Sequence, residues 1–170
     1  MKMIEYKRFL NASEVLDHYG FNSVPVDVVG LCKTLGISVE ESDLTDFENQ
    51  IGGEKISGIL YMDGHGTGKI YVNKDEADVR KRFTIAHELG HYYLHFNGTS
   101  GTFVSLRRSR SARETEANRF AAQLLMPDNL LYKESARSFF PSVSRLAKQF
   151  DVSNEAMGYR LDDLGLYYVG

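Results

Sequence analysis

The amino-acid sequence predicts an α+β protein: a mainly helical single domain with a small β-sheet, or hairpin, ahead of its longest helix. The length of 170 residues, with 42% hydrophobic and 25% charged residues, suits one globular domain. Most of the chain spaces its apolar residues by three and four, which is typical of amphipathic helices. Residues 57–62 and 69–73 are instead β-rich and flank a glycine-rich turn, which predicts a hairpin.

Two short helices are predicted near the N-terminus. Residues 9–20 have helical apolar spacing that ends at Gly20. The run that follows Pro25 ends in the same way at Gly36. Glycine directly after a periodic apolar run is a common helix stop. Cys32 falls on the apolar side of the second helix, so we expect a plain core cysteine.

The small sheet is predicted to follow these helices. Residues 37–40 have the character of a short strand, whereas the polar residues 43–55 predict a loop. The hairpin over residues 57–73 comes next in the chain. His65 lies in its turn, and we expect it to be a solvated loop residue rather than a ligand.

The C-terminal half is predicted to contain several helices and one polar loop. Its elements are, in order, a helix over 75–96, a loop over 97–112, a helix over 114–126 that stops at Pro127, and helices near 142–150 and 154–164. We expect one domain over residues 1–170. It would have a core over about 1–135 and a helical tail over about 138–170 that resembles a helix-turn-helix.

Composition argues against several classes of protein. The net charge of −3 gives no basic excess for nucleic acid. The N-terminus has no apolar signal region, and no apolar run approaches the roughly 20 residues of a membrane span. The one cysteine cannot form an internal disulfide. We therefore expect a cytoplasmic protein with no membrane partner.

The strongest chemical signal is the run His87-Glu88-Leu89-Gly90-His91. Histidines four residues apart lie on one helix face, about 6 Å apart along the axis, and can bind one ion. Glu88 is rotated by about 100° from His87, so it can face the open coordination position. A carboxylate there can take a proton from water whose pKa zinc lowers toward about 7. The spacing therefore predicts a Zn2+ site with Glu88 as the catalytic base.

A surface helix that happens to carry two histidines and an acid is the plain alternative. Apolar and small residues, however, cover much of the helix circumference: Phe83, Ala86, Leu89, Gly90, Tyr93 and Leu94. Such a helix is expected to be buried. Buried imidazoles and a buried carboxylate need partners, and a metal ion supplies them.

A catalytic zinc site also needs a third protein ligand. His95 lies about 12 Å from the first histidine along the axis, so we expect it to cap, pack or line a cleft. Glu114 shares a helical face with small alanines that allow a close approach to the histidine helix, so it is the better candidate. Glu116 lies about 200° round that helix and should face solvent. Asn118, one turn after Glu114, should accept the distal N–H of a ligand histidine.

Residues 83–95 and 114–127 together resemble the ImmA/IrrE family of metallopeptidases. The resemblance extends to residues 25–37 and to the hairpin, so it covers most of the chain. The family is similar to gluzincins, whose third zinc ligand is a glutamate on a second helix.

The resemblance implies that His87, His91 and Glu114 are the metal ligands and that Glu88 is the catalytic base. Gluzincins often have an aspartate where this chain has Asn118, which keeps an acceptor but removes a charge. Members of the family typically cleave or antagonise helix-turn-helix repressors of mobile elements, toxin–antitoxin pairs or stress regulons.

Two further segments have weaker signals. Residues 106–113 are basic and could clasp an acidic substrate, although a solvated loop is the ordinary interpretation. The helix-turn-helix-like tail has Glu155, Asp162 and Asp163 on its second helix, with Arg160 as the one cation. DNA phosphates repel such a helix, so we expect a packing unit rather than a DNA reader.

Two functions are compatible with these residues. The leading hypothesis is a zinc-dependent endopeptidase that cuts a helix-turn-helix repressor or antitoxin at one site, with the edge of the hairpin over residues 57–73 pairing with the substrate. The alternative is a non-proteolytic, zinc-containing regulatory protein that binds a repressor or DNA. Glu88, an acid beside the open coordination position, favours the endopeptidase hypothesis. The sequence leaves open which residue stabilises the oxyanion, and the candidates are Tyr71, Arg82, Tyr92 and His95.

Overall fold

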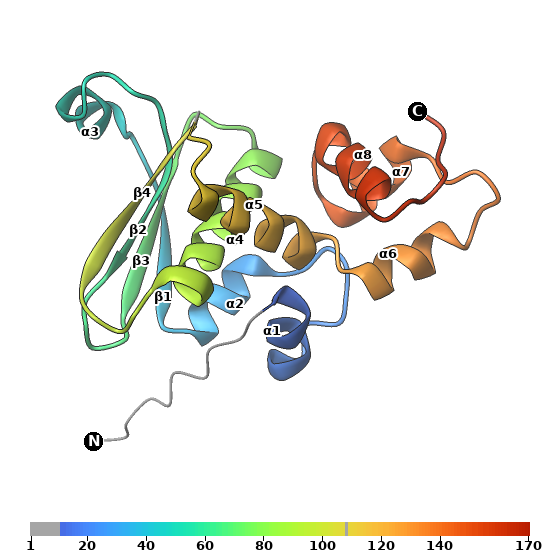
Figure 1. The fold of residues 1–170 in the computed structure, drawn as a ribbon, viewed down its shortest axis with the longest axis horizontal. Coiled ribbons are helices and arrows are strands. Elements are labelled where there is room, and N and C mark those ends of the chain that lie inside the picture. The colour runs from blue at the N-terminus through green and yellow to red at the C-terminus, as the bar shows by residue number, and fades with distance from the viewer. Residues whose placement is uncertain (1–10, 108) are drawn as a thin grey trace.

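The structure is a computed structural model that describes residues 11–107 and 109–170. In this part of the chain, eight helices accompany a four-stranded sheet (Figure 1), which confirms the predicted α+β class. Residues 9 and 10 of the first predicted helix and Arg108 of the basic segment lie outside the described residues. The elements are α1 (Ala12–Tyr19), α2 (Val28–Thr34), β1 (Ile37–Ser42), α3 (Thr45–Gln50), β2 (Ile56–Met62), β3 (Gly68–Asn73), α4 (Asp78–His95), β4 (Gly101–Leu106), α5 (Ala112–Leu125), α6 (Asp128–Ser135), α7 (Val143–Phe150) and α8 (Asn154–Asp163).

The sheet has the strand order β1-β3-β2-β4. β1 pairs with β3 in parallel, and β2 is antiparallel to both β3 and β4. The predicted hairpin is therefore present as β2 and β3, but both strands are interior. The expectation that this hairpin offers a free edge is wrong, because β1 and β4 occupy the two edges.

Two segments predicted to be loops are regular structure. Residues 101–106 form β4 because Thr102, Phe103 and Val104 suit a strand and find a partner in β2. Residues 45–50 form α3, where the buried Glu48 carboxylate accepts hydrogen bonds from the Ile56 amide at 3.1 Å and the Lys55 ammonium at 2.5 Å. In both cases the stabilising contact comes from outside the element itself, so the local pattern did not show it.

Each face of the sheet packs against a different cluster. Leu60, Ile70 and Val72 face the main core and α4. On the other face, Leu44 packs with Ile56 and Ile59 in a small second cluster beside α3. The alternation along β2 places neighbouring residues in different clusters, as a strand with two covered faces requires.

α4 and α5 lie between the sheet and the α7–α8 pair (Figure 1). They pack closely at Gly90, where an added Cβ would lie 3.0 Å from the Cα of Ala117 and 3.1 Å from its carbonyl oxygen. The main core continues into the C-terminal helices through Leu124, Leu146 and Phe150. Within the described residues, 11–107 and 109–170, no helix is both long and apolar enough to cross a membrane.

Several single-residue expectations are confirmed. α1 ends at Gly20, which has a φ of 74°, and Gly36 after α2 has a φ of 72°. Glycine adopts this left-handed conformation without steric cost. Cys32 is fully buried in the core, where burial raises the pKa of its thiol to about 12. His65 is exposed in the β2–β3 turn.

Candidate metal centre

α4 places His87 and His91 one turn apart on a face that is almost wholly inside the protein. Their relative exposures are 6% and 3%. The two Nε2 atoms lie 3.1 Å apart, so both rings direct the same nitrogen toward one point. The burial predicted from the apolar residues around this helix is therefore present.

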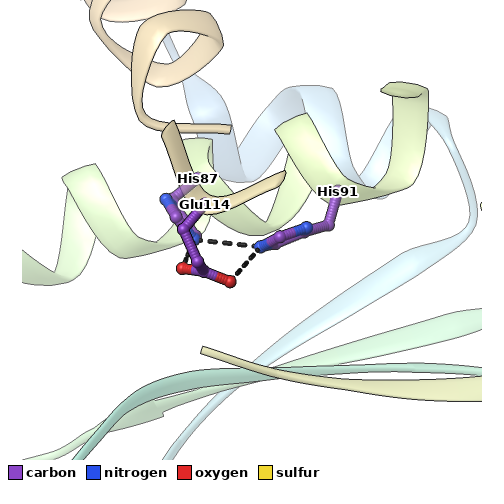
Figure 2. Close-up of side chains that lie close together, drawn as sticks. All are labelled: His87, His91 and Glu114. Atoms are coloured by element: carbon purple, nitrogen blue, oxygen red, sulfur yellow. Dashed lines mark hydrogen bonds and ion pairs between the residues drawn. The ribbon is translucent and has the colours of Figure 1, made fainter. Parts of the chain in front are cut away.

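Glu114 reaches the same point from the first turn of α5 (Figure 2). Its Oε2 lies 3.1 Å from His87 Nε2, and its Oε1 lies 3.1 Å from His91 Nε2. The Ser111 side chain begins α5 by accepting from the Glu114 amide at 3.3 Å, which fixes where this turn starts. One potential ligand atom from each residue lies within 4.8 Å of the others, so the three can surround one ion.

The ring nitrogens directed away from this point are also held. His87 Nδ1 lies 2.9 Å from Asn118 Oδ1, which is one turn after Glu114 on α5. An amide oxygen only accepts, so His87 carries its proton on Nδ1 and directs the Nε2 lone pair at the cluster. His91 Nδ1 lies 2.9 Å from His95 Nδ1, and the His91 ring stacks against Phe103 of β4 with centroids 5.8 Å apart.

His95 and Glu116 lie outside the three-residue cluster. His95 Nε2 is 2.9 Å from a carboxylate oxygen of Glu116, whose side chain is 61% exposed. These two residues therefore form a second layer behind His91, with Glu116 on the solvent side. Glu114 and Glu116 are on different faces of α5, as their separation of about 200° requires.

The three clustered side chains influence one another's protonation. Burial alone would lower the pKa of His87, but Glu114 and Glu88 outweigh it and raise that pKa. Burial lowers the pKa of His91, and the neighbouring His87 and His95 rings act in the same direction. Burial opposes ionisation of Glu114, yet the two neighbouring imidazoles outweigh it and hold its pKa at about 2. Glu114 is thus a carboxylate, the form that binds a cation.

Glu88 is fully buried beside this cluster. Neither of its carboxyl oxygens has a hydrogen-bond partner among the described residues. Burial raises the pKa of Glu88 to about 7, and the charge of His87 and the nearby Ser105 hydroxyl oppose that rise. A carboxyl group with this pKa can both take and return a proton near neutral pH.

β2 makes room for the Glu88 carboxyl by having no side chain at Gly58. A Cβ there would lie 2.8 Å from Glu88 Oε1 and 2.5 Å from the Thr84 methyl carbon. Sequence reasoning missed Gly58, and it also missed Ser105 and Phe103 of β4. The available signal was the glycine inside a β-rich run, which often marks a close approach.

The four residues named from the sequence as candidates to stabilise the oxyanion lie outside the cleft beside the cluster. Arg82 donates to the Val26 and Asp151 carbonyls at 3.0 and 3.1 Å. Tyr71 packs against the second cluster, on the other face of the sheet from α4. Neither of these, nor Tyr92 or His95, is among the described residues that line the cleft.

A cleft of about 700 Å³ opens beside the cluster and is lined on that side by His87, Glu114 and Asn118. Its volume is typical of a ligand pocket. The donor set, two imidazoles and one carboxylate with a cleft beside them, fits a catalytic zinc site with an open position. A shared cation would satisfy both Nε2 lone pairs and the carboxylate at once in this mostly buried position.

Comparisons with known proteins agree with this geometry. A family model described as the IrrE N-terminal-like domain matches residues 32–162, a range that includes α4 and α5. Metallopeptidase ImmA of Bacillus subtilis (strain 168) is 27% identical over 121 residues, which is 71% of this chain and 70% of that protein. Both findings confirm the resemblance that the two motifs predicted.

Proposed function

Because the chain belongs to the IrrE N-terminal-like family of metallopeptidases, we propose that it is a zinc-dependent endopeptidase with Glu88 as its general base. His87, His91 and Glu114 would hold the metal. The observation that carries the proposal is the Glu88 carboxyl, which is buried and unpartnered among the described residues, directly beside that cluster.

The chain's own groups suit peptide hydrolysis. When bound, zinc would supply Lewis-acid chemistry that polarises the scissile carbonyl and acidifies water. The Glu88 carboxylate takes one proton from the attacking water as the carbon–oxygen bond forms. It then returns that proton to the amide nitrogen as the carbon–nitrogen bond breaks. Asn118 keeps the His87 ring in one tautomer, with its Nε2 lone pair toward the metal.

β4 is the sheet edge nearest the site, and it takes the role first expected of the hairpin. Phe103 of this strand stacks on His91, and Ser105 lies in the cleft. An extended peptide that pairs with an exposed edge gains main-chain hydrogen bonds independent of its sequence. We propose that β4 aligns the substrate beside the metal.

The proposed substrate is a helix-turn-helix repressor or antitoxin, cut at one site. The family resemblance supports this choice, because its members act on such regulators. The proposed location is the cytoplasm, where these regulators work. Direct DNA binding by the chain is disfavoured, because Arg160, the one cation of α8, is 4% exposed and is paired with Asp128 and Asp163.

The test uses a helix-turn-helix repressor from the same organism as the candidate substrate. Co-expression with the wild-type chain should yield defined repressor fragments, identified by immunoblotting and mass spectrometry. Glu88→Gln should abolish them, a fall of about 10²–10⁴-fold in rate, because an amide cannot accept the proton. Zinc content is measured in both proteins and should be equal.

Each other outcome points away from the proposal in its own way. Equal fragmentation by Glu88→Gln would falsify the role of Glu88. Full-length repressor under inducing and resting conditions would exclude this substrate. Repression relieved equally by both forms, with no fragments, would establish the non-proteolytic regulatory alternative.

A further inference from the structure

α8 forms a wall of the cleft that contains the candidate metal centre. Ala156, Tyr159 and the preceding Val152 line the same cleft as His87 and Glu114. The C-terminal part of the chain therefore helps to line the space available to a substrate.

Two arginines hold this wall to the helices of the metal centre. Arg82 of α4 binds Asp151, in the α7–α8 turn, through both the backbone oxygen at 3.1 Å and the carboxylate at 3.0 Å. Arg160 of α8 donates to the Met126 carbonyl at the end of α5, at 3.2 Å. Their side chains are 17% and 3% exposed. α8 is thus fixed relative to both α4 and α5.

The part of the cleft beside α8 is mainly apolar. It is lined by Val79 and Phe83 of α4, Ala122 of α5, Met126 after it, Val152, and Ala156 of α8. The two alanines leave space that larger side chains would fill, and Met126 and Val152 lie buried beneath. Tyr159 stands at the rim with 69% of its surface exposed.

The charged groups in this part of the cleft are largely balanced. The Arg160 guanidinium and the Asp163 carboxylate pair at 3.0 Å. Arg119 and Glu155 also line the cleft and have opposite charges, and Arg80, a third cation in this part, lies 3.5 Å from the Glu76 carboxylate. A strongly charged substrate group therefore finds no net attraction here, whereas an apolar group gains from leaving water.

The helices give the distance from the metal centre to this apolar part. Ala122 is eight residues beyond Glu114 on α5, and Val79 is eight residues before His87 on α4, which correspond to about 12 Å along each axis. An extended peptide advances about 3.3 Å per residue, so three or four residues span this distance.

We propose that α8 and the facing sides of α4 and α5 form a specificity subsite for one bulky apolar side chain of an extended substrate. That side chain lies three or four residues from the bond that is cut, and Tyr159 covers it. The inference rests on the proposed function in so far as the occupant is a substrate.

Binding of peptide hydroxamates to the zinc-loaded protein tests the subsite without turnover. Two panels are needed, with the chelating group at the carboxyl end in one and at the amino end in the other. In each panel, the third or fourth residue counted from the chelating group is Leu, Phe, Gly or Asp, and the rest of the peptide is constant. Leu or Phe should bind about tenfold more tightly than Gly in one panel, as expected for burying such a side chain.

Tyr159→Ala should reduce this preference by about threefold or more, because the aromatic ring supplies one side of the contact. Tyr167→Ala is the matched control, since Tyr167 is 94% exposed and is absent from the cleft lining. Both variants should unfold in urea like the wild-type protein. Equal affinities for Leu, Gly and Asp in both panels would overturn the subsite, as would no hydroxamate binding or an equal loss in the two variants.

Cleavage assays separate this inference from the proposed function. A binding preference that depends on Tyr159, without any Glu88-dependent cleavage, would support the subsite and remove the peptidase assignment. Glu88-dependent cleavage with no apolar preference at the third or fourth residue would do the reverse.

Discussion

Two groups of buried polar side chains lie along α5, and they differ in how fully their polar atoms are paired. Near its first turns are His87, Glu88 and Glu114, and beyond its last turn is Arg160. The guanidinium of Arg160 donates through Nε to the Met126 carbonyl, through Nη1 to Asp163 and through Nη2 to Asp128. In the first group, both Glu88 oxygens have no partner among the described residues, and two imidazole nitrogens face each other at 3.1 Å.

This difference in pairing distinguishes a candidate binding site from a group that only holds two helices together. A buried polar atom without a partner costs about 1–3 kcal/mol, so a fold has no reason to retain several unless a ligand completes them. The Arg160 group is already complete and joins α8 to the end of α5. We propose that a cation and a substrate complete the first group, and the following changes test that contrast.

Removal of a ligand from the first group should have the largest effect. Glu114→Ala, like His87→Ala or His91→Ala, should lose the single zinc ion expected per chain. The affinity should fall by more than the roughly 10–100-fold typical of a residue that only supports a ligand. Competition with a chromogenic chelator measures this. Glu116→Ala is the matched control on the same helix, and its zinc affinity should match the wild-type value. The reverse result would assign the ligand role to Glu116.

Asn118 should matter less than the ligands and more than its exposed neighbours. Asn118→Ala removes the acceptor 2.9 Å from His87 Nδ1 and should weaken zinc binding by about 10–100-fold. Asn118→Asp restores an acceptor with a full charge, so its affinity should equal or exceed that of the wild type. The same chelator titration compares the three proteins. An Asn118→Ala protein with wild-type affinity would show that the ring is held by other contacts.

The contact of α4 with α5 can be isolated by changing two glycines in the same way. Gly90→Ala places a Cβ 3.0 Å from the Ala117 Cα, whereas Gly158→Ala on α8 meets no atom within 4 Å. Both changes gain the same helix propensity, about 1 kcal/mol. Gly90→Ala should therefore be less stable than Gly158→Ala by about 1–3 kcal/mol in urea unfolding, the usual cost of overpacking. Equal stabilities would mean that the two helices separate freely.

The elements that could be predicted from the sequence are those whose own residues have a recognisable local pattern. α4 and α5 have helical apolar periodicity, and the hairpin strands flank a glycine turn. The segments missed were β4, α3 and α6. β4 becomes regular by pairing with β2, which lies about forty residues earlier in the chain. No local pattern contains that pairing.

The candidate site also has parts that follow from the local sequence pattern and parts that depend on how separate segments pack. Helical phase was enough to bring Glu114 toward His87 and to put Asn118 behind it, because all positions on a helix are related by its geometry. Gly58 and Ser105 come from sheet strands, and Tyr159 comes from the tail. Their approach to the cleft depends on how separate elements pack, which a single sequence does not specify.

The smallest effect is expected from the completed group. Arg160→Met keeps most of the buried aliphatic volume and removes the charge. The carboxylates left behind are 58% exposed for Asp128 and 69% for Asp163, so water can hydrate them. The Met126 carbonyl loses its donor, while the cost of burying a guanidinium disappears, so the net loss should be about 1 kcal/mol in urea unfolding. Zinc affinity should not change, because no member of this group contacts His87, His91 or Glu114. A parallel fall in zinc affinity would show that the two groups are coupled through α5, and the distinction between a binding site and a group that only holds two helices together would then fail.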